Sequence, residues 1–129
     1  MAVKGVYVVW LYLPTEQWIT IGKLGEYQFR PGVYGYCGSA QSNLEARILR
    51  HQKKEKPLRW HIDYLRRVCS YLGAVVIHLD KAGECLLAKE LIKIPSACYP
   101  VRGFGSSDCH CLSHLVWIPS LLPRNAVRR

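Results

Sequence analysis

The sequence predicts one α/β or α+β domain, in which helices flank a small central, mainly antiparallel β-sheet. Apolar runs of strand length alternate with segments of helical periodicity along the chain. A hairpin pattern follows the first run and favours antiparallel pairing. The chain has 129 residues, of which 50% are hydrophobic, so it can bury a core but is about one domain long. We expect this domain over residues 1–119 and a loose basic tail over residues 120–129.

The first half of the chain holds most of the expected strands. Residues 5–13 are rich in β-branched and aromatic side chains, which predicts a buried strand. Residues 18–21 and 27–29 read as two arms of a hairpin with a glycine turn between them. The turn at Arg30-Pro31-Gly32 predicts that the next strand covers residues 33–37.

Three helices are expected. Ser42 followed by Glu45 is a capping-box pattern, which predicts a helix over residues 43–54 with Leu44, Ile48 and Leu49 as its core stripe. Pro57 ends that helix, and the pattern resumes over residues 58–68.

A strand over residues 71–79 leads to Asp80, which caps an expected helix over residues 82–93. Pro95 ends this helix. The glycines and serines of residues 94–113 indicate a loop, and residues 115–118 are a last short strand.

The charge balance points to a polyanionic partner. Lys and Arg number 18 against 9 Asp and Glu, a net charge of +9. Such an excess on a small domain favours nucleic acid, and we expect DNA before RNA and no membrane. Basic residues concentrate in residues 47–67, and the candidates for the phosphate backbone are Arg50, Lys53, Lys54, Lys56 and Arg59.

The cysteines and the N-terminal apolar run indicate in which cellular compartment the protein is expected. The run over residues 6–13 is short and leads into Pro14 and Glu16, where a signal peptide would have a cleavage site of small residues. No run reaches transmembrane length. We therefore expect a cytoplasmic protein whose six cysteines are reduced and mostly serve as small buried hydrophobes.

One stretch, residues 32–51, gathers groups suited to phosphate chemistry. Tyr34 and Tyr36 end the predicted strand, and a glycine turn leads into the helix that carries Arg47 and His51. These two lie four positions apart and so share a helix face. Aromatic hydroxyls, an arginine and a histidine brought together across such a turn predict phosphodiester chemistry.

Paired tyrosine motifs carry a family resemblance. Residues 5–7 read GVY and residues 36–38 read YCG, and with Arg47 and a later glutamate they resemble the GIY-YIG nuclease superfamily. That superfamily is named for a Gly-Ile-Tyr strand and a Tyr-Ile-Gly strand lying side by side. The chain most resembles an uncharacterised prokaryotic branch of it, a domain of unknown function, through further matching stretches in the same order: residues 32–40, 44–51, 60–65, 84–88 and 103–115.

The resemblance implies a GIY-YIG-like fold and a metal-dependent endonuclease that hydrolyses phosphodiester bonds in DNA, including branched or damaged DNA. It places Tyr7 and Tyr36 near the attacking water, Arg47 on the phosphate, and Glu84 on Mg²⁺ or Mn²⁺. His51 would shuttle a proton or hold the phosphate. The alternative is a nucleic-acid-binding module of the same fold that cuts weakly or not at all. The connection over residues 14–31 is longer than is typical of these nucleases, which can reshape the substrate groove.

Several further residues are candidates for supporting roles. The side chains expected around the site are His61, Asp63, Ser107, Asp108 and His114. Cys109, Cys111 and His114 could bind zinc, with Cys85 or His61 as a fourth ligand. The C-x-C spacing is tight for zinc, so structural burial is the favoured interpretation, and a zinc-stabilised adaptor is a third functional option. A lone domain of this size also leaves room for a protein partner that supplies targeting.

Overall fold

The fold is α+β, as the sequence predicts, and is built on a four-stranded antiparallel sheet with strand order β5-β1-β4-β6. The computed structural model describes residues 4–78, 83–106 and 111–121. The proposed helix cap Asp80 and the basic tail from residue 122 onward lie outside the described residues. Within the described residues, no helix is long and apolar enough to cross a membrane.

The centre of the sheet is formed by β1 (Gly5–Leu13) and β4 (Gly32–Ala40), which pair along their whole length. The outer strands are β5 (Ser70–Ile77) beside β1 and β6 (Leu115–Ile118) beside β4. Both central strands are almost wholly buried, which explains their near-continuous apolar sequence. The outer strand β5 instead exposes several apolar side chains, namely Leu72, Val75, Val76 and Ile77.

The expected hairpin is confirmed as β2 (Gln17–Ile21) and β3 (Gly25–Phe29), which form a separate two-stranded sheet. The hairpin occupies the connection between β1 and β4. It returns the chain so that β4 pairs antiparallel with β1. The long connection therefore still allows the two tyrosine motifs to lie on neighbouring strands.

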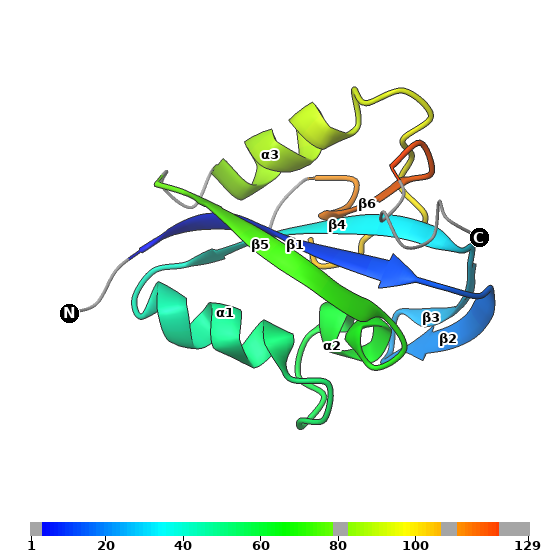
Figure 1. Cartoon of the computed structure of the whole chain (residues 1–129), viewed down its shortest axis with the longest axis horizontal. Helices are drawn as coiled ribbons and strands as arrows, with labels where there is room; N and C mark the ends of the chain where they lie inside the picture. The colour runs from blue at the N-terminus through cyan, green and yellow to red at the C-terminus, as the bar shows by residue number, and fades with distance from the viewer. Residues whose placement is uncertain (1–3, 79–82, 107–110, 122–129) are drawn as a thin grey trace.

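Helices cover both faces of the sheet. In Figure 1, α1 (Leu44–Gln52) and α2 (His61–Arg66) lie below the sheet and α3 (Gly83–Leu91) lies above it. Because side chains alternate along a strand, each face of the sheet has its own apolar cluster. Val8 and Cys37 pack with Ala88, Leu87 and Leu91 on the α3 side, while the larger cluster on the α1–α2 side includes Tyr7, Leu11, Phe29, Leu65 and Phe104.

The first two helices depart from the sequence prediction at their ends. The N-cap of α1 is Asn43, in a left-handed conformation, and its Oδ1 accepts a 3.2 Å hydrogen bond from the Ala46 amide. The expected cap at Ser42 is therefore one residue early. Leu49 is half exposed and does not belong to the core stripe. The helix expected over residues 58–68 shortens to α2, since residue 60 has extended backbone angles.

The state of the cysteines also differs from expectation. Cys85 and Cys111 form a disulfide, with Cα atoms 6.2 Å apart, so the expectation of wholly reduced thiols is wrong for this pair. Sequence spacing gives no hint of it because the two residues come together only through the fold. Cys37 and Cys69 are buried thiols as expected, whereas Cys98 is an exposed one.

Candidate functional site

A cavity of about 400 Å³ opens where β4 ends and the chain turns into α1. Its walls come from segments far apart in the sequence: β1, β4, α1, α2, α3 and the loop before β6. The lining residues are Tyr7, Tyr36, Gly38, Ser39, Gln41, Ser42, Arg47, Arg59, Trp60, His61, Glu84, Gly105 and His114. Four residues singled out from the sequence, Tyr7, Tyr36, Arg47 and Glu84, thus share one cavity.

The strand register sets the position of the two tyrosines. Tyr7 is paired with Gly38, and Tyr36 is paired with Val9, so the two tyrosines lie diagonally on the same face of the β1–β4 ladder. A Cβ atom added at Gly38 would lie 2.6 Å from Tyr7 Oη. The glycine of the second motif is therefore needed because the ring of the first motif lies directly against it.

A second glycine of the cavity lining, Gly105, is also held against a tyrosine ring. A Cβ at Gly105 would lie 2.8 Å from Cε1 of Tyr36, and this glycine has a φ of +70°, which L side chains rarely adopt. Tyr36 is further fixed by edge contact with Phe104. Burial, and then the neighbouring Tyr7, raise the pKa of the Tyr36 hydroxyl above its ordinary value.

His51 lies behind Tyr7 and does not line the cavity. Its Nε2 is hydrogen-bonded to Tyr7 Oη at 2.7 Å, and its ring contacts Tyr7, Tyr36 and Trp60. Burial lowers the pKa of His51 from 6.5 to about 3, and the charge of Lys56 acts in the same direction. Burial raises the pKa of Tyr7 from 10.0 to about 12, although Arg47 opposes the shift. At neutral pH the pair is therefore an uncharged phenol against an uncharged imidazole.

Arg47, which lines the cavity, is held by contacts with Ser39 and Trp60. Its Nη1 donates to the Ser39 carbonyl at 3.0 Å, and its guanidinium lies 4.5 Å from the centre of the Trp60 ring. Arg50 approaches the same indole at 4.2 Å. Trp60 thus orients Arg47 through a cation–π contact.

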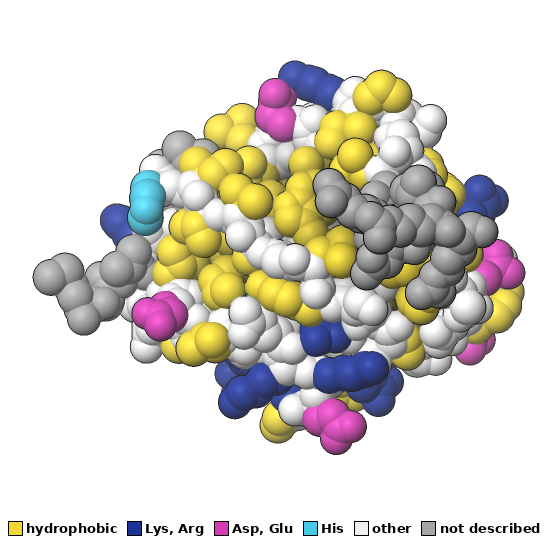
Figure 2. Space-filling view, in the orientation of Figure 1, with side chains coloured by type: hydrophobic (Ala, Val, Ile, Leu, Met, Phe, Trp, Pro, Cys, Tyr) yellow, Lys and Arg dark blue, Asp and Glu magenta, His cyan; other side chains and the backbone are white. Residues whose placement is uncertain are grey.

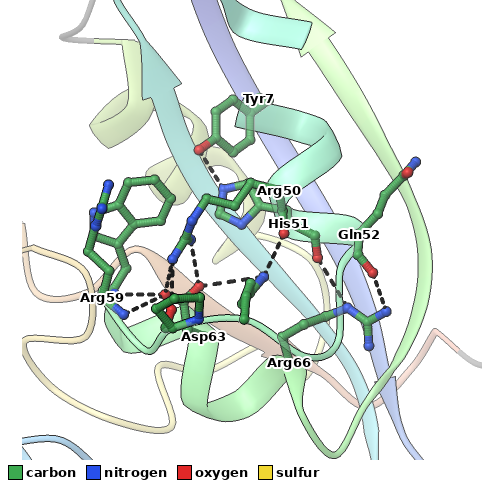
Figure 3. Close-up of polar contacts among 10 residues, drawn as sticks. Tyr7, Arg50, His51, Gln52, Arg59, Asp63 and Arg66 are labelled. Atoms are coloured by element: carbon green, nitrogen blue, oxygen red, sulfur yellow. Dashed lines mark hydrogen bonds and ion pairs between the residues drawn. The ribbon is translucent and has the colours of Figure 1, made fainter. Parts of the chain in front are cut away.

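A buried carboxylate, Asp63, positions Trp60. Its oxygens accept hydrogen bonds from the backbone amides of Arg59 and Trp60, at 2.8 and 2.9 Å. Arg50 binds both oxygens through its two Nη atoms, at 3.0 and 2.9 Å (Figure 3). Lys56 Nζ lies 3.6 Å from Asp63 Oδ1. Burial alone would raise the pKa of Asp63, but the hydrogen bonds from Arg50, Trp60 and Arg59 outweigh burial and hold it below its ordinary value.

The C-terminal end of α1 is fixed from α2. Buried Arg66 donates to the carbonyl oxygens of His51 and Gln52, at 3.1 and 2.7 Å (Figure 3), and to that of Cys69 at 2.7 Å. A cation at the C-terminus of a helix is favourable because the last carbonyls have no partners within the helix. Arg66 therefore fixes the backbone of the residue that contacts Tyr7.

The remaining wall of the cavity carries a carboxylate and two imidazoles. Glu84 comes from the first turn of α3. His61 Nδ1 accepts the Gly105 amide at 2.8 Å, so a neutral ring must carry its proton on Nε2. Burial lowers the pKa of His61, which favours that neutral form. His114 is buried, and its Nε2 lies 3.4 Å from Cys85 Sγ.

The candidates for the phosphate backbone fall into two groups. Arg50 and Lys56 are engaged inside the protein with Asp63. Lys53, Lys54 and Arg59 are exposed, and Arg59 also lines the cavity. In Figure 2, Lys and Arg side chains gather at the lower edge of the molecule, over α1, α2 and the loop between them.

Among the residues that the structure describes, one group of three His, Cys, Asp or Glu side chains lies close enough together to hold a metal ion. It consists of Cys85, Cys111 and His114, whose ligand atoms all lie within 4.8 Å of one another, with the two cysteines joined as a disulfide. Cys109, named with Cys111 and His114 as a zinc candidate, lies outside the described residues, as do Ser107 and Asp108.

Trp60 is the main part of the site that sequence reasoning missed. The helix expected over residues 58–68 would include Trp60, yet this residue precedes α2 and lines the cavity. The sequence did carry a signal that Trp60 precedes the helix. Asp63 lies three positions after Trp60, and an acidic side chain at that position can accept a hydrogen bond from the backbone amide of the N-cap residue.

Comparison with known proteins gives a family and no function. Residues 6–128 match the family described as Domain of unknown function DUF123. No curated protein and no solved structure matched the chain.

Proposed function

The chain belongs to the DUF123 family, a domain of unknown function, and we propose that it is a metal-dependent endonuclease that hydrolyses phosphodiester bonds in DNA. One observation carries the proposal. Tyr7, Tyr36, Arg47 and Glu84 come from four separate elements and line a single cavity. These are the residues for which the resemblance to GIY-YIG nucleases implies a role in catalysis.

The donor set of the cavity fits Mg²⁺ or Mn²⁺. Glu84 offers a hard carboxylate oxygen, and Ser39, Gln41 and Ser42 line the same space with further polar atoms. Mg²⁺ commonly binds through one or two carboxylates, with waters and substrate phosphate completing the octahedron. Glu84 would hold the ion, and a bound divalent cation would supply charge neutralisation at the phosphate and the leaving oxygen.

Arg47 is suited to bind the scissile phosphate. Its planar guanidinium can donate two parallel hydrogen bonds to phosphate oxygens, and its contacts with Ser39 and Trp60 orient it beforehand. Arg59 lines the same cavity and would bind a neighbouring phosphate. His61 can donate from Nε2 because its Nδ1 is taken by Gly105.

Tyr7 and His51 form a route for one proton. In the imidazole tautomer with its proton on Nδ1, Tyr7 Oη donates to His51 Nε2 across 2.7 Å. Substrate phosphate would raise the pKa of His51, and cations at the cavity would lower that of Tyr7, so both shifts favour transfer. Tyr7 Oη could then take a proton from the attacking water as its own proton passes to His51.

The resting pKa values favour a second candidate function. Tyr7 has a pKa of about 12 and His51 one of about 3. Neither pKa is therefore near the pH of the solution before substrate arrives, and both groups remain uncharged. A site in this state suits a nucleic-acid-binding module that holds phosphate through Arg47 without cutting. The same assay separates the two functions.

The test is a cleavage assay on duplex, nicked, single-stranded and branched DNA, with RNA as a further substrate, in Mg²⁺, Mn²⁺ or EDTA. Wild-type protein should cut at least one DNA substrate only when metal is present. Glu84→Gln and Arg47→Ala should each lower the rate by about 100-fold or more, since each removes a charge that acts on the transition state.

Two control variants change the same residue types, a glutamate and an arginine, outside the cavity. Glu90→Gln changes an exposed carboxylate of α3 that pairs with Lys93 outside the cavity, and Arg67→Ala removes an exposed arginine. Both should cut at the wild-type rate. DNA binding without cleavage under every metal condition would refute the endonuclease and support the binding module, whereas equal losses in the controls would refute the assigned roles.

A further inference from the structure

Beside the proposed nuclease centre lies a second cluster with different chemistry. Cys85 belongs to the first turn of α3, while Cys111 and His114 belong to the segment that leads into β6. Their three ligand atoms lie within 4.8 Å of one another, and His114 is buried. Two sulfurs and an imidazole nitrogen are the ligands that Zn²⁺ prefers, and they are too soft for Mg²⁺.

The separation of one sulfur and the imidazole nitrogen matches a tetrahedral zinc centre. Zinc–sulfur bonds of about 2.3 Å and zinc–nitrogen bonds of about 2.0 Å place a sulfur and a nitrogen ligand about 3.5 Å apart. Cys85 Sγ and His114 Nε2 are 3.4 Å apart. The backbone therefore already presents these two ligands at the required separation, and the Cα atoms of the two cysteines lie 6.2 Å apart.

We propose that Cys85, Cys111 and His114 bind Zn²⁺ when the disulfide is reduced, so that reduction converts the cluster from a disulfide to a zinc centre. A dithiol reductant gives two electrons and two protons to the disulfide and is itself oxidised to a disulfide. Zn²⁺ then bonds to both sulfurs and displaces the two thiol protons to solvent. His114 contributes the lone pair of Nε2 and keeps its ring proton on Nδ1.

The site has a structural consequence for the neighbouring cavity. Cys85 directly follows Glu84, and both Glu84 and His114 line the cavity. Either the disulfide or the zinc ion ties the first turn of α3 to the segment before β6. Glu84 therefore stays at the cavity in both states, and reduction without metal removes the tie. The zinc site itself does not depend on nuclease activity.

Cobalt provides the first test. Full-length protein is reduced with a dithiol, freed of reductant and metal without oxygen, and titrated with Co²⁺. We expect one Co²⁺ per chain, with a thiolate-to-metal charge-transfer band and visible bands of tetrahedral geometry, which Zn²⁺ then abolishes. Cys85→Ser and Cys111→Ser should lose the charge-transfer band or most of its intensity, while Cys98→Ser, which alters an exposed free thiol, should keep it.

Alkylation of the wild-type protein gives a test that no folding defect can confuse. In reduced protein, Zn²⁺ should protect Cys85 and Cys111 from iodoacetamide, read residue by residue by mass spectrometry, while Cys98 reacts at the same rate with or without zinc. Absence of Co²⁺ binding, unchanged alkylation of both cysteines, or equal metal binding by the oxidised protein would each overturn the proposal. Cleavage assays are separate, so failure here is distinguishable from failure of the nuclease assignment.

Discussion

The unusual feature at the scale of single residues is a buried histidine held neutral beside a tyrosine. His51 has almost no exposed surface and contacts three aromatic rings. Such surroundings solvate an imidazolium poorly, which is why its pKa falls from 6.5 to about 3. The shift makes the stability of the protein depend on pH in a defined window.

We predict that wild-type protein loses stability as the pH falls from 6.5. The unfolded chain binds a proton on His51 near pH 6.5, while the folded chain resists it until about pH 3. Acid therefore favours unfolding by about 1.4 kcal/mol for each pH unit within this window. The free energy of unfolding from urea titrations at several pH values between 6.5 and about 4 measures the slope.

The control compares two histidines. His51→Gln removes the buried titrating group and should flatten the profile, although its overall stability is lower. His78→Gln alters an exposed histidine and should leave the wild-type slope unchanged. The same slope in His51→Gln as in wild type would contradict the buried neutral imidazole.

At the scale of elements, Asp63 joins α1, α2 and the loop between them. It accepts two backbone amides of that loop and pairs with Arg50 of α1. Since the loop carries Trp60, which contacts Arg47, the carboxylate acts on the cavity without lining it.

We expect Asp63→Asn to destabilise the fold by about 3–5 kcal/mol, because it leaves Arg50 and Lys56 without their shared counter-charge in a buried position. The carboxylate contributes this stability above its unfolded pKa of about 3.9 and loses it as the pH falls through its lower folded pKa. Urea denaturation at pH 7 measures the difference. Glu55→Gln, at an exposed carboxylate of the same loop, should cost little. Equal stability of Asp63→Asn and wild type would rule out this role.

The strands were predictable because their sequences are locally distinct. The β-branched and aromatic run of β1 and the glycine-bounded hairpin pattern lead to the observed elements. Helix ends were not predictable to the residue. Ser42 and Asn43 are both good caps, and only the backbone conformation decides between them. The extended residues before α2 depend on Asp63, a contact made by folding.

In the candidate site, too, some features could be predicted from the sequence and others could not. Tyr7, Tyr36, Arg47 and Glu84 could be named from motifs, and they share the cavity. Three other features depend on contacts between distant segments. They are the position of His51 behind Tyr7, the ion pair of Arg50 with Asp63, and the Cys85–Cys111 disulfide. Sequence spacing carries no information about those contacts.

At the scale of the molecule, Lys and Arg side chains gather in a basic edge (Figure 2), in keeping with the net charge of +9, and Arg59 also lines the cavity. Exposed Lys53, Lys54 and Arg59 belong to α1's C-terminal side and the following loop. A DNA backbone lying along this edge would place one phosphate near Arg47. Binding of this kind depends on the release of counterions.

We predict that DNA affinity falls steeply with salt, and that Lys54→Ala and Arg59→Ala each reduce the slope of log K against log salt by about 1. Fluorescence anisotropy of a labelled duplex over a salt series measures it. Lys93→Ala is the control, because Lys93 pairs with Glu90 and lies outside the cavity lining. A slope that no basic-edge variant alters would place the DNA elsewhere.

The indole of Trp60, which lies against two guanidinium groups, also gives the site an optical signal. Any phosphate that draws Arg47 away from the ring changes the electric field on the indole and therefore its emission. Arg50 remains held by Asp63, so the change would report on one arginine alone. With the other three tryptophans replaced by phenylalanine, occupancy of the cavity could be followed in real time without labelling the DNA.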